Sequence, residues 1–503
     1  MGKIFPIHDL SELLNTKRDK KIILCHGVFD LLHIGHIKYF EEAKSQGDIL
    51  VVTVTPDRFV NKGPDRPHFT EQLRLEAIAA LEIVDYVALN LWPTAVETLL
   101  LLKPDIYAKG PDYQDQTTDL TGKIRDEEEA IRSVGGELFI TSGQVFSSSR
   151  LLNQSLSGYT DEQIEYFRSF ALKHPADEVI SWLKRLHTLR VLVIGETIID
   201  RYSYCYPIGM VTKDPIIAVK YLHEEWFAGG IIAVANHGAG FYHSVDLISA
   251  LGEKDSYEQF IHTHLKDEVN SHFIYKTDSP TIIKQRFVDA YLNQKLFEVH
   301  TINDEMVSMD QTNELIQKFS SLISDIDLVL VVDFGHGMIS SPFIEKIVGS
   351  GVFTAVNTQT NAGNRGFNVI SRYPKVDYVS LNATELNLEE RTNAGDIKSK
   401  ILNVVERVSA NEVLITEGKY GTILYDREDG FIRTPAFAGK VVDRIGAGDA
   451  IISITAGLAC LNAPADIIGF VANAVASMAV STVGHRTSIE PVGLYKYITT
   501  LLK

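Results

Sequence analysis

The sequence predicts an α/β protein with parallel β-sheets in two separate domains. Short apolar runs rich in β-branched residues alternate with segments of helical apolar spacing, which implies right-handed βαβ units. The chain has 503 residues, which is too long for one ordinary domain. The alternation is interrupted once, by a charged helical stretch that separates two series of strands.

The predicted strands form two series, one on each side of the connector. In the first series five apolar runs are expected to form buried strands, with a helix over residues 71–84 among them: 21–27, 49–56, 85–90, 105–110 and 137–142. Residues 154–189 form a charged, amphipathic helical connector with one proline break. The second series contains six strands: 191–200, 244–252, 328–335, 353–359, 378–384 and 412–418. A long helical block rich in Ala and Ile follows Gly446. The expected domains are therefore residues 1–153 and 190–503.

Composition excludes several classes of partner. Apolar content of 45% and charged content of 22% are ordinary for a globular protein, and the net charge of −17 argues against a nucleic-acid partner. No apolar run approaches the roughly 18 residues of a membrane span, and the N-terminus lacks the apolar core of a signal peptide. The three cysteines, Cys25, Cys205 and Cys460, are far apart and form no CxxC motif. We therefore expect a cytoplasmic protein without disulfides or a structural zinc site.

The segment Gly27–His36, GVFDLLHIGH, places two histidines where a strand gives way to a helix. A helix N-terminus offers free N–H groups and a positive dipole end, so it favours a phosphate. His33 and His36, three residues apart, share one face of the helix and can both donate to phosphate oxygens. The alternative for a bare HxGH is a pair of surface histidines. Asp30 is expected to cap the helix.

This run resembles the signature of the HxGH nucleotidyltransferases, which include glycerol-phosphate cytidylyltransferases and sugar-phosphate adenylyltransferases. Class I aminoacyl-tRNA synthetases share a HIGH motif, but this chain has no KMSKS-like segment. Further matches follow in the order of the transferase group, at residues 62–67, 74, 109–113 and 146–152. They are most similar to the adenylyltransferase half of the bifunctional heptose kinase/adenylyltransferases of lipopolysaccharide biosynthesis. The resemblance implies a Rossmann-like domain that joins a nucleotide to a sugar 1-phosphate and releases pyrophosphate.

The resemblance also implies roles for individual residues. His33 and His36 would be catalytic and would hold the α- and β-phosphates of a nucleoside triphosphate, with ATP favoured over CTP. Serine hydroxyls and N–H groups at a second helix start would bind phosphate, and basic side chains would neutralise its charge, although each basic residue alone could be a solvated surface charge. The nucleotide- and phosphate-binding candidates are Gly27, Phe29, Lys44, Lys62, Arg66, Arg74, Ser147, Ser148 and Ser149.

The strongest pattern in the second half is DRIGAGDA, residues 443–450. Gly446, Ala447 and Gly448 at a helix start place successive N–H groups around an anion, and we call these three residues the anion nest. Asp449 follows and points into the same space. Five other segments accompany it: GETIIDRY from Gly195, AGG from Ala228, DFGHG from Asp333, NATE from Asn382 and TEGKYG from Thr416.

Together these segments resemble the PfkB/ribokinase carbohydrate kinases over nearly all of residues 190–500. The resemblance implies a ribokinase-like α/β domain that uses ATP and Mg²⁺. Asp449 would take the proton from a sugar hydroxyl, and the anion nest would hold the charge of the transferring phosphoryl group. Asn382 and Glu385 would hold Mg²⁺ through water. Asp200, Gly229 and Gly230 would contact the sugar.

The chain also departs from the heptose kinases. Ala233 stands where those kinases have a sugar-binding Asn, and the nearest Asn, Asn236, is shifted. Residues 357–359 replace an acidic-Pro-Lys triplet, and Glu196 replaces a shorter Asp. The domain order is reversed relative to the familiar bifunctional enzyme.

Two functional hypotheses therefore remain. The first is a bifunctional enzyme of nucleotide-sugar synthesis, and the second is a monofunctional nucleotidyltransferase with a non-catalytic, ligand-binding kinase-like half. A third, an RNA-binding module, lacks a basic stripe and an aromatic stacking platform. The expected partners are small molecules, a nucleoside triphosphate and a sugar phosphate, with no nucleic acid and no membrane. We also expect a homo-oligomer.

Overall fold

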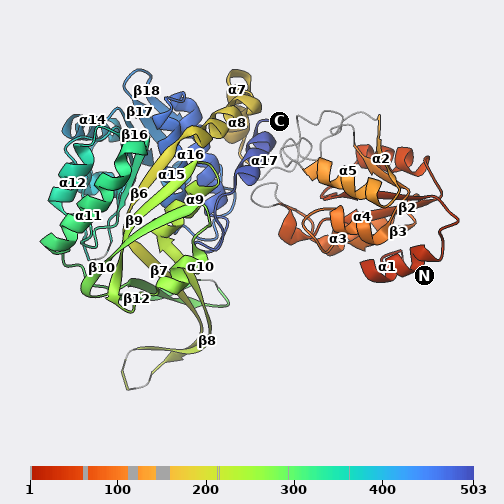
Figure 1. Cartoon of the computed structure of the whole chain (residues 1–503), viewed down its shortest axis with the longest axis horizontal. Coiled ribbons are helices and arrows are strands. Elements are labelled where there is room, and N and C mark those ends of the chain that lie inside the picture. Colours follow the sequence, from red (N-terminus) through yellow and green to blue (C-terminus); the bar gives the residue numbers. More distant parts are fainter. Residues whose placement is uncertain are drawn as a thin grey trace. The chain divides into compact units, whose positions relative to one another are not determined.

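The computed structural model describes residues 3–60, 66–110, 123–142, 159–211, 213–214, 216–292, 294–361 and 363–503. The chain forms two compact units, Met1–Ala171 with Val492–Lys503, and Leu172–Pro491. Figure 1 shows the elements of both units along the sequence. The boundaries predicted at residues 153 and 190 stay a prediction. The connector consists of helices α7 (Asp161–Lys173) and α8 (Ala176–Arg185), broken at Pro175 as expected.

The first unit contains a five-stranded sheet in which every pairing is parallel, in the order β3-β2-β1-β4-β5. Its strands are β1 (Ile22–Gly27), β2 (Ile49–Val54), β3 (Tyr86–Leu89), β4 (Ile106–Lys109) and β5 (Glu137–Ile140). The order reverses direction between β1 and β4. Ligands of doubly wound sheets bind beyond the carboxyl ends of the strands at such a switch point. The HxGH segment follows β1 at this place.

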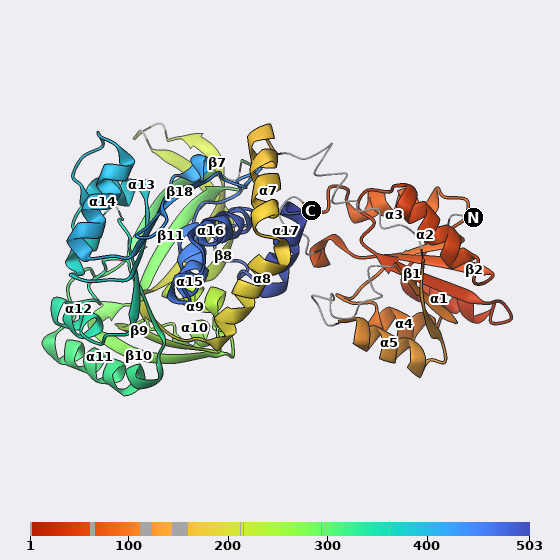
Figure 2. The same cartoon turned by 90° about the horizontal axis from the view of Figure 1, so that it is seen from above.

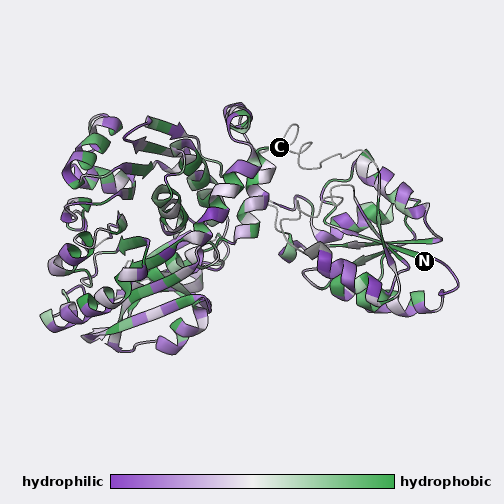
Figure 3. Ribbon diagram, turned by 45° about the horizontal axis from the view of Figure 1, so that its top comes forward, coloured by the Kyte–Doolittle hydropathy of each residue, from purple (hydrophilic) through white to green (hydrophobic). Residues whose placement is uncertain are grey.

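Helices cover both faces of this sheet, which explains why its strands are apolar throughout. One core lies between the sheet and α1, α4 and α5, and a second lies between the sheet and α2 and α3. Figure 2 shows the two groups of helices on opposite sides, and Figure 3 shows hydrophobic strands between helices with hydrophilic outer faces. The helices of the unit are α1 (Ile7–Asn15), α2 (Ile34–Lys44), η1 (Asp57–Phe59), α3 (Glu71–Ala79), α4 (Val96–Leu102), α5 (Lys123–Ser133) and α17 (Pro491–Leu501).

The second unit is built on a nine-stranded sheet, in the order β10-β9-β6-β13-β14-β15-β16-β17-β18. Its pairings are parallel from β10 to β16 and antiparallel from β16 to β18. The strands are β6 (Arg190–Gly195), β9 (Ser244–Lys254), β10 (Val269–Pro280), β13 (Leu328–Asp333), β14 (Phe353–Thr358), β15 (Tyr378–Asn382), β16 (Glu412–Thr416), β17 (Thr422–Asp426) and β18 (Gly430–Thr434).

Helices again lie on both sides of the nine-stranded sheet. One core joins a face of the sheet to α11, α12 and α14, whereas α9, α15 and α16 pack on the other face. The helices are η4 (Leu186–Thr188), α9 (Ile231–Ala239), α10 (Glu258–His264), α11 (Met309–Leu322), η5 (Ile323–Asp325), α12 (Ser341–Val348), η6 (Ile370–Arg372), α13 (Ala383–Glu389), α14 (Ile397–Val408), η7 (Gly418–Tyr420), α15 (Ala447–Cys460) and α16 (Ala465–Ala479).

A separate four-stranded sheet, in the order β12-β11-β7-β8, completes the second unit. It consists of β7 (Thr197–Met210), β8 (Ile217–Gly230), β11 (Ile282–Asp289) and β12 (Gln294–Thr301). Strand β11 runs parallel to β7, with Lys284 opposite Asp200. A small core that includes Tyr202 and Phe227 packs against Ile445. This sheet therefore reaches the segment that leads into the anion nest.

All eleven predicted strands are present, and the helical block after Gly446 forms α15, α16 and α17. The helix expected over residues 71–84 ends earlier, at Ala79. The four-stranded sheet was not predicted beyond the start of β7. Within the described ranges no helix is both long and apolar enough to cross a membrane.

Candidate active sites

The HxGH segment forms the start of α2. His33 is the N-cap residue, and its Nδ1 accepts a hydrogen bond from the Gly35 N–H at 3.0 Å. A ring nitrogen that accepts is deprotonated, so a neutral His33 carries its proton on Nε2 and can donate it to a ligand. Burial lowers the pKa of His33, which favours this neutral form. The prediction that Asp30 caps the helix is wrong, because His33 occupies that position.

The two histidines lie together, as predicted. Their ring centroids are 4.0 Å apart with an interplanar angle of 25°, and the Phe29 ring meets His36 edge-on at 5.3 Å. Phe29 has a φ of 49°, an uncommon left-handed conformation, which turns the chain between β1 and α2. A Cβ at Gly27 would lie 2.9 Å from the Phe29 ring, so glycine is needed beneath it.

Asp30 anchors the segment after residue 65 instead of capping α2. Its carboxylate pairs with Arg66 at 3.1 Å and accepts from the N–H groups of His68 and Phe69. Both side chains of the ion pair are almost fully buried. Arg66 is thus held close to the turn after β1 and stays a candidate for binding phosphate.

Two other basic candidates have different roles. Lys44 lies in the last turn of α2, at the opposite end from His33, and bonds Asp85 at 2.5 Å. The prediction that Lys44 reaches the triphosphate is therefore wrong. The Arg74 guanidinium is buried and donates to Val28 O, Thr55 O and Asp57. Because these N–H groups already donate to oxygens of the protein, the prediction that Arg74 binds phosphate is also wrong.

Four predicted contacts, Lys62, Ser147, Ser148 and Ser149, lie outside the described residues. The structure gives a role to Lys109, which lies in one of the segments matched from sequence. The Lys109 ammonium at the end of β4 pairs with Glu127 at 2.7 Å. Burial acts to raise the pKa of Glu127, but Lys109 outweighs it and holds the pKa below its usual value. Lys109 therefore ties β4 to α5.

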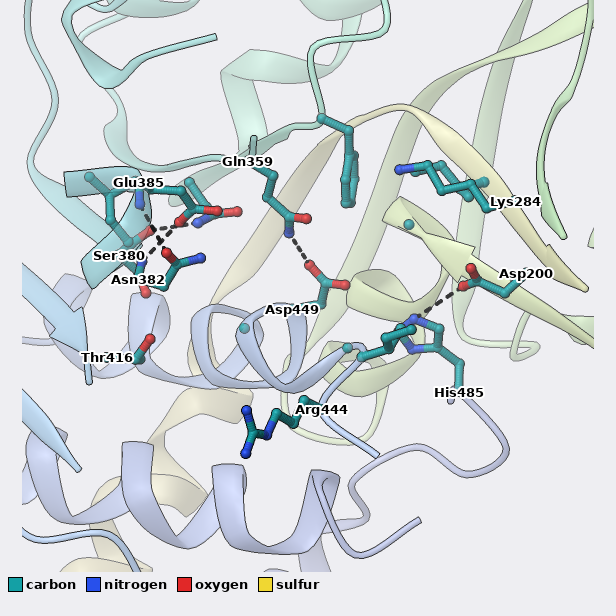
Figure 4. A pocket seen from close by; sticks show the side chains of 18 of the residues that line it. Asp200, Lys284, Gln359, Ser380, Asn382, Glu385, Thr416, Arg444, Asp449 and His485 are labelled. Carbon is teal, nitrogen blue, oxygen red and sulfur yellow. Dashed lines mark hydrogen bonds and ion pairs between the residues drawn. The ribbon is translucent and has the colours of Figure 1, made fainter. Parts of the chain in front are cut away.

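The second unit contains a cavity of about 270 Å³. It is lined by residues from both sheets and from the segment before α15: Ile198, Asp200, Gly230, Lys284, Arg286, Phe334, Asn357, Gln359, Ser380, Leu381, Asn382, Glu385, Thr416, Arg444, Ile445, Gly446, Gly448, Asp449 and His485. Figure 4 shows Asp449 between two groups, with Asp200 and Lys284 on one side and Asn382 and Glu385 on the other.

Asp449 lies in the first turn of α15, directly after the anion nest. Its Oδ1 accepts a hydrogen bond from Gln359 Nε2 at 2.6 Å (Figure 4). Burial raises the pKa of Asp449, and the charge of His485 and the Gln359 hydrogen bond offset part of this rise. Gly446 has a φ of 81°, and a Cβ there would lie 2.3 Å from the His485 ring. The nest therefore requires glycine at this position.

Charged groups from β7 and β11 form one end of the cavity. Asp200 bonds Arg286 and lies 3.5 Å from His485 Nε2 (Figure 4). Lys284 stands opposite Asp200 in the strand register, and its ammonium makes no hydrogen bond within the part of the chain that the structure describes. Burial lowers the pKa of Lys284, although the charge of Asp200 opposes this. A partly buried, unpaired cation at this end favours an anionic group on a ligand.

The predicted glycine pair adjoins the same end. A Cβ at Gly229 would lie 2.1 Å from Asp200 Oδ2, and Gly230 is the N-cap residue of α9. Ala233 is buried in α9, and the shifted Asn236 bonds His264 O and the Lys266 N–H. Asn236 is therefore used within the fold and does not replace the missing asparagine.

Oxygen-bearing side chains form the other end of the cavity. Asn382 and Glu385 make a reciprocal capping box at the start of α13. Burial raises the pKa of Glu385 to about 7. The buried Oδ1 of Asn357 has no hydrogen-bond partner among the described residues. An acceptor without a partner facing a cavity suits a ligand or a metal-bound water.

Among the described residues, no three His, Cys, Asp or Glu side chains group closely enough to hold a metal ion alone. Mg²⁺ usually binds through one or two carboxylates, several waters and substrate phosphates, so Glu385 with Asn357 fits a magnesium nucleotide. Sequence reasoning missed Lys284, Arg286, Arg444 and His485. Arg444 lies within the DRIGAGDA motif, but nothing in the sequence around the other three residues places them in a site.

The pfkB family carbohydrate kinase model matches residues 188–491, which is more than half of the chain. The chain belongs to the pfkB family of carbohydrate kinases. The cytidylyltransferase-like family model matches residues 24–154, so this pfkB family member carries a cytidylyltransferase-like domain ahead of its kinase domain. The predicted fold class and order of domains are confirmed.

Curated relatives of this pfkB family member include proteins named bifunctional protein HldE. The protein from Trichlorobacter lovleyi is 36% identical over 159 residues, which is 31% of each chain. That from Aliarcobacter butzleri is 40% identical over 121 residues, 24% of this chain and 25% of the relative. The chain thus spans less than a third of the length of either relative. Phosphofructokinase-2 from Escherichia coli has a similar structure, with a TM-score of 0.50 and 15% identity over 62% of this chain and 99% of that one.

Proposed function

We propose that the chain is a bifunctional enzyme of nucleotide-sugar synthesis. Its kinase domain phosphorylates a sugar or a sugar phosphate with ATP. Its cytidylyltransferase-like domain joins a nucleotide to a sugar 1-phosphate, with ATP favoured over CTP. The observation that carries the proposal is the position of Asp449, a buried carboxylate directly after the anion nest and between the two ends of one cavity.

In the kinase domain the acceptor lies at the end formed by Asp200 and Lys284. Asp449 accepts the hydroxyl proton while the hydroxyl oxygen attacks the γ-phosphorus of ATP, and the bond to the bridging oxygen of ADP breaks. The nest N–H groups stabilise the charge on the transferring phosphoryl group. Glu385 and Asn382 would hold Mg²⁺ through water, together with the side-chain Oδ1 of Asn357. The ion would neutralise phosphate charge.

The unpaired ammonium of Lys284 supports an acceptor that already carries an anionic group. Its neighbour Arg286 is occupied by Asp200 and Glu298, so Lys284 is the cation at this end that is left for a ligand. This favours a sugar phosphate over a neutral sugar. The exposed Arg444, which also lines the cavity, is a candidate for the triphosphate of ATP.

In the first domain a phosphate oxygen of the sugar 1-phosphate attacks the α-phosphorus, and pyrophosphate leaves. The nucleophile is already an anion, so positioning and charge neutralisation provide most of the catalysis. His33 donates through Nε2, and His36 lies beside it. Arg66, Gly27 and Phe29 would complete the phosphate site.

The alternative is a monofunctional nucleotidyltransferase whose kinase-like domain binds ligand without catalysis. Ala233 and Gln359, which differ from the heptose kinases, favour it. The test is mass spectrometry of products after incubation with ATP or CTP, Mg²⁺ and a library of sugars and sugar phosphates. Nucleotide-sugar formation without any ADP would support the alternative, and no product of either reaction would refute both. The cytoplasmic location and the homo-oligomer stay predictions. Light scattering tests the oligomeric state.

A further inference from the structure

Lys295 and Asp443 form an ion pair just outside the kinase cavity. Lys295 lies on β12 of the four-stranded sheet, and Asp443 lies three residues before the first glycine of the anion nest. Lys295 Nζ is 2.5 Å from Asp443 Oδ1, and the Asp443 side chain is only 4% exposed. Neither residue lines the cavity itself.

Asp443 connects three segments around the nest. Its carboxylate accepts a hydrogen bond from the Tyr202 hydroxyl at 2.8 Å. It also accepts from the N–H groups of Ile445 at 3.1 Å and Gly484 at 3.2 Å. Ile445 directly precedes the nest, and Gly484 directly precedes the histidine that covers it. One buried carboxylate therefore fixes both the nest segment and its cover.

The charge of Asp443 has an effect of its own. Burial acts to raise the pKa of Asp443, but the hydrogen bond and charge of Lys295 and the Ile445 N–H outweigh it and hold the pKa below its usual value. Asp443 is therefore ionised at neutral pH. An ionised carboxylate this close to the nest would repel a phosphoryl group unless a cation neutralised it.

We propose that Lys295 is a positioning residue for phosphoryl transfer, because its ammonium neutralises Asp443 and ties β12 to the nest segment. The proposal rests on the proposed kinase function. It implies that the anion nest is complete only when the four-stranded sheet is in place. The sheet would then contribute to phosphoryl transfer as well as to acceptor binding.

The test compares variants by the steady-state rate of ADP release. Lys295→Met should lower kcat on the order of 10²-fold, because the charge of Asp443 would then be left uncompensated beside the nest and would weaken its stabilisation of the transferring phosphoryl group. The acceptor KM should change by less than about threefold, because the acceptor end is intact. Lys295→Arg, which keeps the charge, should stay within about fivefold of the wild type. The double variant Lys295→Met/Asp443→Asn should recover at least about tenfold over Lys295→Met.

A matched control is Lys254→Met, which breaks an exposed ion pair with Asp278 in the same unit. It should leave kcat unchanged. Lys295→Gln keeps a donor for Asp443 without the charge, and it replaces Lys295→Met if that variant does not fold. A wild-type kcat in folded Lys295→Met or Lys295→Gln would overturn the proposal. So would a folded double variant that recovers nothing, because the pair would then act through structure alone.

A binding measurement separates this proposal from the proposed function. If the wild type releases no ADP with any acceptor, the kinase function fails, and calorimetry with magnesium ADP and aluminium fluoride decides the role of Lys295. Aluminium fluoride mimics the transferring phosphoryl group. Lys295→Gln should weaken its binding at least about tenfold and leave ADP alone unaffected. Equal affinities for wild type and variant would overturn the proposal.

Discussion

Replacing Asp449 by Asn tests the assignment of the base. The amide has nearly the shape of the carboxylate but cannot take a proton from the acceptor hydroxyl. Its oxygen can still accept from Gln359 Nε2, which lies 2.6 Å from Asp449 Oδ1, so the local packing is kept. The Nδ2 group then faces the acceptor end, where the hydroxyl oxygen can accept from it. Any loss of rate therefore reports the proton transfer.

The expected loss of kinase rate is about 10²–10⁴-fold, the usual scale for a positioned general base. This corresponds to roughly 3–5 kcal/mol of activation free energy. Although Asp449→Asn should lower the kinase rate, it should leave the free energy of unfolding unchanged or raise it. Burial raises the pKa of Asp449, so an ionised carboxylate there costs stability at neutral pH, and an amide avoids that cost. The variant should therefore melt at or above the wild-type temperature.

Two assays on one protein measure the effect. ADP release is followed with an acceptor sugar phosphate, and pyrophosphate release is followed with a sugar 1-phosphate. The second rate should stay close to that of the wild type, because it depends on His33 and His36 in the other unit. Asp278→Asn, at an exposed position, is the matched control. An unchanged ADP rate would remove Asp449 as the base, and an equal loss in both assays would refute the assignment of separate sites.

Other predictions follow from the same contacts. His36→Ala should abolish pyrophosphate release and leave ADP release nearly intact, and an equal fall of both rates in a folded variant would contradict two sites. Arg286→Met leaves the buried Asp200 without its guanidinium and should lower the free energy of unfolding by about 3–5 kcal/mol, measured in urea. Burial, with the charge of a neighbouring carboxylate, raises the pKa of Glu196 to about 7. Stability from this group is present below about pH 4.5 and is lost as pH rises towards 7, so Glu196→Gln should flatten that decline by on the order of 3 kcal/mol; parallel pH profiles would contradict this. A chain cut after Leu156 should give two soluble fragments, and precipitation of both, or a single cooperative transition, would argue against an independent boundary.

The parallel sheets could be predicted because their strands are covered on both faces. Strands such as residues 49–54 and 328–333 are apolar at nearly every position, which distinguishes them from the helices between them. The four-stranded sheet has strands that alternate polar and apolar residues or end in exposed ones. Strand β11, with IIKQRFVD, has no continuous apolar run, and β8 is mostly exposed along its first half. Its pairing comes from tertiary contacts that local pattern does not contain.

The same reason limited the prediction of the sites. The glycines and histidines proposed to bind phosphate form short motifs, so His33, His36 and the anion nest could be located from sequence. Side chains at the acceptor end come from strands that neighbour each other only in the folded sheet, as Asp200 and Lys284 do. Lys44 was misplaced because helical spacing gave its face but not its distance from the end of the helix. Eight residues after His36, it lies about 12 Å along the axis.

The acceptor end proposed for the kinase unit stands on two strands of the smaller sheet. Asp449, the anion nest and the nucleotide end belong to segments around the nine-stranded sheet, whereas Asp200 and Lys284 stand on β7 and β11 of the smaller one. In the proposed kinase, substitutions of Asp200 and Lys284 would change which acceptor is taken, whereas Tyr202 on β7, which bonds Asp443, would have to be kept. A new acceptor specificity would then need changes at a few strand positions only, and exchanging single residues of β7 and β11 is the direct way to engineer one.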